Sequence, residues 1–400
     1  MTTLLGVEAV VDVGPVAHGG HCVARIDGRV VFVRHALPGE RVRVTITEGG
    51  EDSRFLRGDA VEVLTASPHR VDRPCPYAGP GRCGGCDFQH ASLAYQRDLK
   101  AAVVREQFSR LAGIDVEVTV EPLPGDEDGL RWRSRVEFAV DDEGRAGLRK
   151  HRSHEIIPVA DCLIADRRIV ESGVLDITWT GYSRVDAVAP DDPQGVVLVA
   201  FPGGLEQSVG QRVEISGWSG EFRVDARGFW QVHPGAAPTF VSHVLDSLAP
   251  EPGERVLDLY AGAGLFAAAL ADAVGPSGSV LAVEGDRRAV GHGAANTASR
   301  PWVEWRQGRV DRAIRPLVAQ QIHADLVVLD PPRSGAGRDV CRDIAALTPR
   351  AIAYVACDPA ALARDTAYLQ SAGYRLASLR AFDAFPMTHH VECVGVFAPA

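Results

Sequence analysis

A cysteine, Cys357, lies where a run of apolar residues at 351–356 ends and a helical pattern at 359–372 begins. The N-terminus of a helix favours a thiolate over a thiol, and the thiolate is the nucleophilic form. The position therefore predicts that Cys357 attacks a substrate. The alternative is a small buried side chain, which is the role that we expect of Cys22, Cys341 and Cys393.

A carboxylate, Glu392, lies in a short apolar strand near the end of the chain. It is either an ordinary residue of an edge strand or a partly desolvated base with a raised pKa. A nucleophile and a base are the two groups that an addition and elimination reaction at a carbon atom requires, and no catalytic metal is needed.

A third group of residues is typical of a nucleotide site. Gly262 and Gly264 join a strand to a helix, and Glu284 ends the next strand, where its carboxylate can accept hydrogen bonds from both hydroxyls of a ribose. The same pattern fits a dinucleotide fingerprint or a tight turn with no ligand. Asp330 leads a loop that two prolines, Pro331 and Pro332, stiffen, and such a loop can hold a flat base or a cofactor amine.

Three cysteines lie in a loop rich in glycine and proline, Cys75, Cys83 and Cys86, and Cys162 is the expected fourth ligand. Four-cysteine sites hold zinc or an iron–sulfur cluster, and the spacing leaves both open.

The elements that must position these residues fall into three segments. Residues 1–66 show short alternating runs between glycine turns, which predict a small β-barrel. Residues 67–225 predict a mostly β central domain with the cysteine loop and one helix at 92–112, capped by Ser92 and ended by Gly113, which we expect to pack on the catalytic domain. Residues 226–400 alternate strands and helices, so the fold class is α/β plus β, with a Rossmann-like C-terminal domain and its sites at the carboxyl ends of the strands.

The composition excludes several classes of protein. The chain has 46% hydrophobic residues and a net charge of −10, which argues against a disordered chain and against binding nucleic acid by bulk charge. No apolar run is long enough to cross a membrane and no secretory signal begins the chain, so we expect a cytoplasmic protein. The segment 161–225 holds 5 basic and 11 acidic residues, whereas 144–154 is basic and is either an RNA-facing strip or a solvated turn.

Five boxes together resemble the RNA uracil-5 methyltransferase family, whose members use S-adenosylmethionine. The boxes are 229–233 (FWQVH), 258–264 (DLYAGAG), 330–335 (DPPRSG), 357–365 (CDPAALARD) and 385–392 (FPMTHHVE). The resemblance implies that Cys357 is the nucleophile and Glu392 the base. It implies cofactor contacts from Gln231, Tyr260, Gly262, Gly264, Glu284 and Asp330, and substrate contacts from Phe229, Pro331, Arg333 and Arg364.

Three residues depart from the family pattern. His233 replaces an asparagine of the first box, Leu265 stands where an asparagine often contacts the cofactor, and Ala361 replaces a threonine. The first two departures affect single contacts, and the cysteine and the glutamate are intact.

Two further segments resemble parts of the same family. The glycine-rich pattern at 19–40 is similar to a TRAM domain, an RNA-binding barrel. The cysteines resemble the 4Fe-4S ligands of the members that act on ribosomal RNA, although the first spacing is two residues longer, and zinc stays the alternative.

We therefore expect a monomer that methylates C5 of a uridine in 23S rRNA or tRNA, with RNA and no membrane as its partner. Attack of the cysteine on C6 makes C5 nucleophilic, and the base later removes the C5 proton. The alternatives are a non-catalytic RNA-binding or assembly protein on the same scaffold and a methyltransferase for another substrate.

Overall fold

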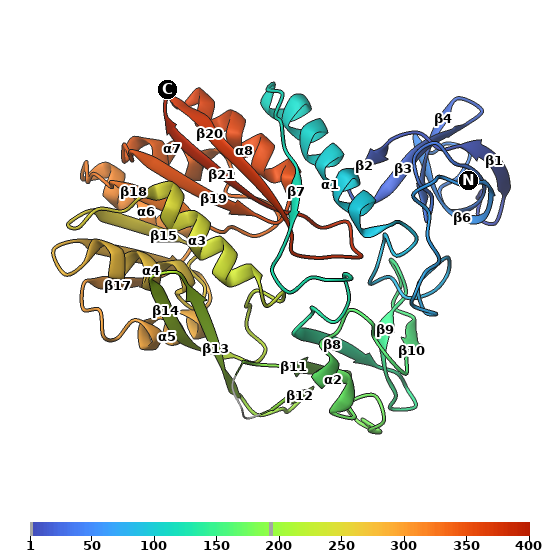
Figure 1. Cartoon of the computed structure of the whole chain (residues 1–400), viewed down its shortest axis with the longest axis horizontal. Helices are drawn as coiled ribbons and strands as arrows, with labels where there is room; N and C mark the ends of the chain where they lie inside the picture. The colour runs from blue at the N-terminus through green and yellow to red at the C-terminus, as the bar shows by residue number, and fades with distance from the viewer. Residues whose placement is uncertain (1–2, 192–194) are drawn as a thin grey trace.

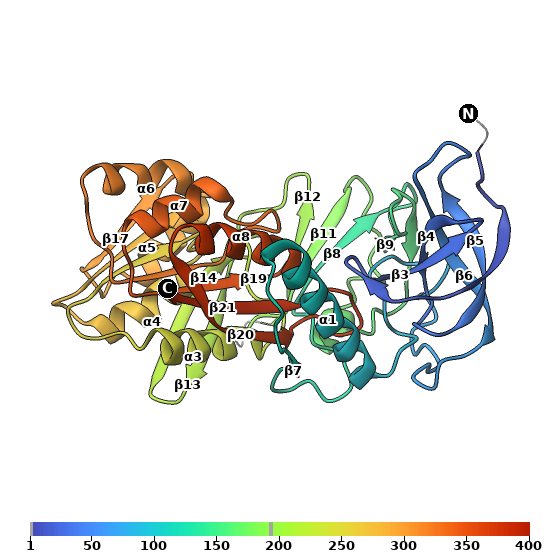
Figure 2. The ribbon, with the colours of Figure 1, turned by 90° about the horizontal axis from the view of Figure 1, so that it is seen from above.

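The computed structural model describes residues 3–191 and 195–400. Figures 1 and 2 show an N-terminal barrel at one end, a C-terminal α/β domain at the other, and a central domain between them. Within the described residues, no helix has both the length and the apolar character that a membrane crossing requires.

The N-terminal barrel is a curled six-stranded sheet in the order β1-β5-β6-β4-β3-β2. Gly14 N–H donates to Val23 O at 2.8 Å, so the chain after β1 also pairs with β3 and nearly closes the barrel. Every second residue of β5 faces the core, which is the alternation that the sequence predicts. The strands are β1 Glu8–Asp12, β2 Val16–Ala17, β3 His21–Ile26, β4 Arg29–Arg34, β5 Arg41–Glu48 and β6 Phe55–Thr65.

The central domain contains a five-stranded antiparallel sheet in the order β10-β9-β8-β11-β12 and one short helix, α2. Its core consists of side chains such as Phe138, Ile169 and Val185. The elements are β8 Arg135–Val140, β9 Ala146–Arg149, β10 Ile156–Pro158, α2 Arg167–Glu171, β11 Arg184–Val188 and β12 Val197–Phe201.

The predicted helix at 92–112 is α1 (Leu93–Gln107), which continues as one π-helical turn, η1 (Phe108–Ala112). Gly113 ends it in the left-handed conformation (φ 66°), as predicted. Ser92 is the N-cap residue, as predicted, although its side chain makes no capping hydrogen bond. Val104 and Phe108 pack in the same core as α8 of the C-terminal domain, and α1 lies between the barrel and that domain in Figure 2.

The C-terminal domain is built on an eight-stranded sheet in the order β17-β16-β15-β18-β19-β21-β20-β7. The strands from β17 to β19 are parallel, and β21 is antiparallel to both of its neighbours. β18 and β19 are buried along their whole length, because helices cover both faces of the sheet. The strands are β7 Val120–Pro122, β15 Arg255–Leu259, β16 Ser279–Glu284, β17 Val303–Gln307, β18 Leu326–Leu329, β19 Ala351–Ala356, β20 Tyr374–Asp383 and β21 Glu392–Pro399.

The helices of this domain are α3 Ala236–Leu248, α4 Leu265–Val274, α5 Arg287–Asn296, α6 Val310–Ala319, α7 Arg338–Ala346 and α8 Pro359–Ser371. The sequence predicted four of them and missed α3 and α6. The buried residues of α6 recur at helical spacing, at 310, 313, 314 and 317, but Pro316 inside the helix obscured the pattern. The hairpin of β13 (Ser208–Ile215) and β14 (Trp218–Asp225) precedes the expected boundary at 225, yet its apolar residues share a core with α3 and α4.

Candidate active site

The pairing of β19 with β21 brings the predicted nucleophile and base together. The register matches Ile352 with Phe397 and Ala356 with Cys393. Continued by one residue beyond this last pair, the register would set Cys357, which directly follows β19, opposite Glu392, and the charge of Glu392 helps to raise the pKa of Cys357. Directly opposed residues of an antiparallel pair have Cβ atoms about 5 Å apart on one face of the sheet. Cys357 and Glu392, which are 35 positions apart in the sequence, therefore reach the same small part of the site.

Burial controls the ionisation of this pair, and nearby negative charge adds to its effect. Glu392 is 2% exposed, and burial, reinforced by the charge of Asp330, raises its pKa well above the usual value. Burial also raises the pKa of Asp330 to about 7. A positively charged ligand would stabilise the ionised form of both carboxyl groups, so these two groups suit a cation.

The expectation that the helix terminus makes Cys357 a thiolate is wrong for the protein without ligands. Burial raises the pKa of this thiol to about 12, and the charges of Glu392 and Asp330 add to the rise. Arg333 acts in the opposite direction. Desolvation and two nearby carboxylates outweigh the dipole of α8, because the dipole of an exposed helix end stabilises a charge by only about 0.3–1 kcal/mol.

The loop at 330–337 is held by residues of β19 and α8. The carboxylate of Asp365 accepts hydrogen bonds from Ala336 N at 2.8 Å, Gly337 N at 3.0 Å and the hydroxyl of Tyr354 at 2.7 Å. Arg364 donates to Ser334 O at 2.7 Å and to Asp365. Pro331 is buried and Arg333 is exposed. Arg364 therefore stabilises the loop in which the side chain of Arg333 is exposed.

The glycine turn lies at the carboxyl end of β15, which is separated from β19 by β18. Gly262 has φ +54°, and a Cβ there would meet no atom within 4 Å, so its backbone is open to a ligand. Gly262 N–H donates to one carboxylate oxygen of Glu284 at 2.9 Å, and Asp286 N–H donates to the other at 2.8 Å. Asp258 lies beneath the turn with one oxygen that has no partner among the described residues, and burial raises its pKa to about 8.

The remaining predicted contacts occupy different environments. Gln231 is buried, Tyr260 is partly buried in the core beneath the sheet, and Phe229 is 72% exposed. Leu265 is a core residue of α4. His233 is buried, stacks on Trp132 with ring centroids 6.0 Å apart, and accepts a hydrogen bond from Gly235 N. It packs at the junction with the central domain.

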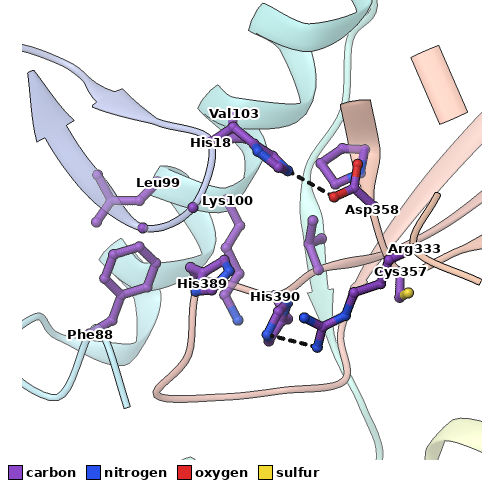
Figure 3. Close-up of a pocket in the computed structure, with 14 residues that line it drawn as sticks. His18, Phe88, Leu99, Lys100, Val103, Arg333, Cys357, Asp358, His389 and His390 are labelled. Atoms are coloured by element: carbon purple, nitrogen blue, oxygen red, sulfur yellow. Dashed lines mark hydrogen bonds and ion pairs between the residues drawn. The ribbon is translucent and has the colours of Figure 1, made fainter. Parts of the chain in front are cut away.

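A cavity of about 150 Å³ opens beside Cys357, and parts of the chain that are distant in sequence line it. Figure 3 shows the barrel turn with His18, helix α1 with Leu99 and Lys100, and the segment after β20 with His389 and His390 around this space. Burial lowers the pKa of His390 to about 3, so its neutral ring accepts a hydrogen bond from Arg333 at 3.3 Å. The sequence assigned no role to these five lining residues, because only the tertiary fold places the barrel and α1 here.

Helix α1 fixes the segment that leads to Glu392. Gln96 accepts a hydrogen bond from Met387 N at 2.9 Å. Lys100 donates to Phe385 O at 3.0 Å and forms an ion pair with Asp383 at 2.5 Å, and neither of these charged side chains is exposed. These contacts prevent the segment 383–391 from moving independently of α1.

The four candidate metal ligands form no disulfide. As their side chains stand, no three His, Cys, Asp or Glu residues within 3–191 and 195–400 are grouped closely enough to hold a metal ion. The four cysteines nevertheless share one neighbourhood. Burial, followed by the charges of Cys162 and Cys75, raises the pKa of Cys83, and the charges of Cys162 and Cys83 likewise add to the effect of burial on Cys86. Gly85 N–H points at Cys83 Sγ at 3.4 Å, and the Gln89 amide points at Cys86 Sγ at 3.2 Å.

Comparison with known proteins gave two family matches, a TRAM domain at residues 3–61 and a tRNA (uracil-5-)-methyltransferase at residues 306–399. An uncharacterized RNA methyltransferase of Streptomyces avermitilis is 47% identical over 99% of both chains. The 23S rRNA (uracil(1939)-C(5))-methyltransferase RlmD of Pseudomonas fluorescens is 34% identical over 95% of this chain and 92% of its own.

Among solved structures, the tRNA (uracil-54, C5)-methyltransferase of Pyrococcus abyssi, in complex with S-adenosyl-L-homocysteine, matches with a TM-score of 0.69. The match covers 97% of this chain and 99% of that one at 20% identity, so it shows a shared fold. The predicted fold class, a β-barrel followed by a β-rich part and a Rossmann-like domain, is confirmed.

Proposed function

Because the chain belongs to the S-adenosylmethionine-dependent RNA uracil-5 methyltransferases, we propose that it methylates C5 of a uridine through a covalent adduct between Cys357 and C6 of the base. The observation that supports this most directly is the strand register that sets Cys357 opposite Glu392 at one end of the sheet. A binding protein on this scaffold would need neither a thiol nor a buried carboxylate at that point.

The residues at the ends of these strands fit S-adenosylmethionine. The open backbone at Gly262 and the carboxylate of Glu284 suit a ribose, and the carboxyl groups of Asp330 and Glu392 suit a sulfonium. When bound, S-adenosylmethionine supplies the methyl group as an electrophile. Its positive charge and that of Arg333 would both lower the pKa of Cys357 toward the range in which the thiolate forms.

The reaction then follows from two side chains. The thiolate of Cys357 forms a bond to C6, and the electrons of the C5–C6 double bond move into an enolate. C5 of the enolate takes the methyl group. Glu392 removes the proton that C5 still bears, the double bond forms again, and the bond between sulfur and C6 breaks. Burial raises the pKa of Glu392, which makes its carboxylate a stronger base than an exposed one.

The mechanism is tested by replacing the nucleophile and by trapping the adduct. We expect Cys357→Ala to lose methylation completely while S-adenosylmethionine binding persists. The wild type should form a complex with RNA that contains 5-fluorouracil and survives denaturing electrophoresis, because fluorine at C5 cannot leave as a cation. Cys341→Ala, another buried cysteine of the same domain, serves as the control. Methylation by Cys357→Ala at the wild-type rate would refute the mechanism.

Cys75, Cys83, Cys86 and Cys162 are our proposed ligands of an iron–sulfur cluster, with zinc as the alternative. The free thiols and the N–H groups directed at two of the sulfurs fit thiolate ligands, since such hydrogen bonds stabilise metal-bound sulfur. The cluster would be structural, because it would tie the loop at 75–86 to the turn that carries Cys162.

Ribosomal RNA is the substrate that we favour, because a relative with 34% identity over nearly the whole chain bears the name of a 23S rRNA enzyme. A strain that lacks the gene should lose a 5-methyluridine from 23S rRNA and keep those in tRNA. Loss from tRNA alone would contradict this substrate and leave the chemistry standing.

A further inference from the structure

Asn296 is the only asparagine in the 400 residues of the chain, and it is the last residue of helix α5. Its side-chain amide makes three hydrogen bonds to backbone atoms. The Oδ1 atom accepts from Arg223 N at 2.9 Å, and the Nδ2 atom donates to Arg223 O at 3.1 Å and to Ala263 O at 2.9 Å. Arg223 belongs to β14, and Ala263 lies between Gly262 and Gly264. Asn296 therefore joins β14 to the glycine turn.

The three bonds match the chemistry of an asparagine side chain. Its amide offers an oxygen that accepts and two N–H groups that donate, and the three contacts use all of them. An ionised aspartate has the same shape but cannot donate, and a serine has only one hydrogen to donate. If the amide were turned over, its N–H groups would face the N–H of Arg223 and its oxygen would face two carbonyl groups. The backbone atoms around Asn296 therefore select both the residue type and the orientation of its amide.

Helix α5 reaches the glycine turn because two glycines lie at their contact. A Cβ atom at Gly264 would lie 3.5 Å from the Cα atom of Gly293, and a Cβ atom at Gly293 would clash with the ring of Trp305. Without these Cβ atoms the backbone of the helix packs closely on the turn. Figure 1 shows β14 beside α5, in agreement with their contacts. The side chain of Asn296 can therefore bond both neighbours of its helix.

Strand β14 leads into the segment 229–231, which contains two of the predicted ligand contacts. The Nη1 atom of Arg135 in the central domain donates to three carbonyl oxygens of residues 225–228, at 3.0, 3.1 and 3.3 Å. Beyond the segment, the backbone N–H of Ser134 and its hydroxyl both donate to Val232 O at 2.9 Å. The segment is thus held on both sides, and its place relative to the glycine turn depends on how β14 is attached to that turn.

We propose that Asn296 is a positioning residue that holds the glycine turn and the segment 229–231 at the spacing that S-adenosylmethionine requires. The inference rests on the proposed function, because it takes both segments as contacts of this cofactor. Asn296 acts through the backbone: the carbonyl group of Ala263 belongs to the same peptide unit as the N–H of Gly264, which donates to Ala261 O at 2.9 Å. A turn that is not held in advance must be ordered when the ligand binds, and this lowers the affinity.

The test measures the affinity of the full-length protein for S-adenosylmethionine by calorimetry, without RNA. We expect Asn296→Asp to bind about tenfold more weakly, because it loses the hydrogen bonds that Nδ2 donates. Asn296→Ser, which keeps one donor, should lose part of this affinity. The matched control is Trp218→Phe, which removes the hydrogen bond from Trp218 Nε1 to Asp272 Oδ2 at 2.8 Å. That bond ties the same hairpin to α4 without touching the glycine turn, so the control should keep the wild-type affinity.

Two further measurements separate positioning from a general loss of stability. In the protein without ligands, Asn296→Asp should speed hydrogen exchange in the peptides that contain residues 223 and 261–264 and leave that of the barrel unchanged. In steady-state kinetics, KM for S-adenosylmethionine should rise while kcat at saturation stays near the wild-type value, because Cys357 and Glu392 are untouched.

Wild-type affinity of both Asn296 variants for S-adenosylmethionine would overturn the proposal. An equal loss in Trp218→Phe would also overturn it, since the effect would then belong to the hairpin as a whole. So would a fall in kcat with unchanged affinity. A wild type that binds S-adenosylmethionine without methylating RNA, with the Asn296 variants weakened as expected, would refute the proposed function and leave this role of Asn296 intact.

Discussion

The Nε2 atom of His18, in the turn between β2 and β3, lies 3.0 Å from Oδ2 of Asp358, the residue that follows Cys357. The other oxygen of Asp358 accepts a hydrogen bond from Ala361 N at 2.8 Å and so caps α8. The barrel that we expect to bind RNA is thereby in direct contact with the helix cap beside the nucleophile. His18 is a positioning residue that acts through Asp358.

His18→Ala should therefore lower kcat while the affinity for S-adenosylmethionine stays unchanged. The hydrogen bond to Asp358 raises the pKa of His18 against the opposing effect of burial, and Glu106 adds to the rise. Because the folded pKa lies above the unfolded value of 6.5, the contact has its full strength below pH 6.5 and weakens as the pH rises through the folded pKa. The ratio of wild-type to variant kcat should fall with pH over this range. The ratio of kcat for His18→Gln to kcat for His18→Ala should not change with pH, because neither side chain titrates. A ratio of wild type to His18→Ala that does not change with pH would contradict the role of the charge.

The thiol of Cys357 should react slowly with iodoacetamide in the protein without ligands. Since its pKa is raised to about 12, the rate should climb about tenfold per pH unit through pH 9, in proportion to the thiolate. Asp330→Asn removes a negative charge that raises this pKa and should speed alkylation at pH 8. Mass spectrometry of the peptide that contains Cys357 follows the reaction. A plateau of the wild-type rate near pH 7 would show a thiolate that the structure does not support.

Lys100→Met should destabilise the protein by about 3–5 kcal/mol, the cost of leaving one member of a buried ion pair without its partner. Asp383 is fully buried, and its Oδ2 atom has no partner among the described residues. The double variant K100M/D383L should recover much of the loss in urea unfolding, because it removes both charges. If the double variant were as unstable as the single one, packing rather than charge would explain the loss.

Anaerobically purified protein should be brown and contain iron. Cys86→Ser should lose the colour and the iron, whereas Cys22→Ala, a buried cysteine of the barrel core, should keep both. Elemental analysis and the visible spectrum measure the outcome. A colourless wild type with one zinc per chain would establish the alternative metal.

The local pattern of the sequence was sufficient for much of the fold. Alternating runs in the barrel and continuous apolar runs such as 326–329 and 351–356 predicted their strands, because burial on one face or on both leaves a local signature. The same reasoning missed α3 and α6, and in α6 Pro316 interrupts an otherwise periodic segment. It also placed the boundary at 225 after a hairpin that packs on the C-terminal domain, since packing partners leave no local trace.

By itself, the sequence determined which residues bear the chemistry: a cysteine after one strand, a glutamate at the start of another, and glycines where the backbone must turn. The types of these residues, and their positions at the ends of strands and helices, indicate their chemistry before any contact between them is known. Only the tertiary structure decided that Cys357 and Glu392 lie together and that Asp330 lies near both. Burial there raises the pKa values of all three groups, and nearby carboxylate charge adds to the rise for Cys357 and Glu392. Only the tertiary structure brought His18 and Lys100 to the same site, because a contact between residues hundreds of positions apart depends on how whole domains pack.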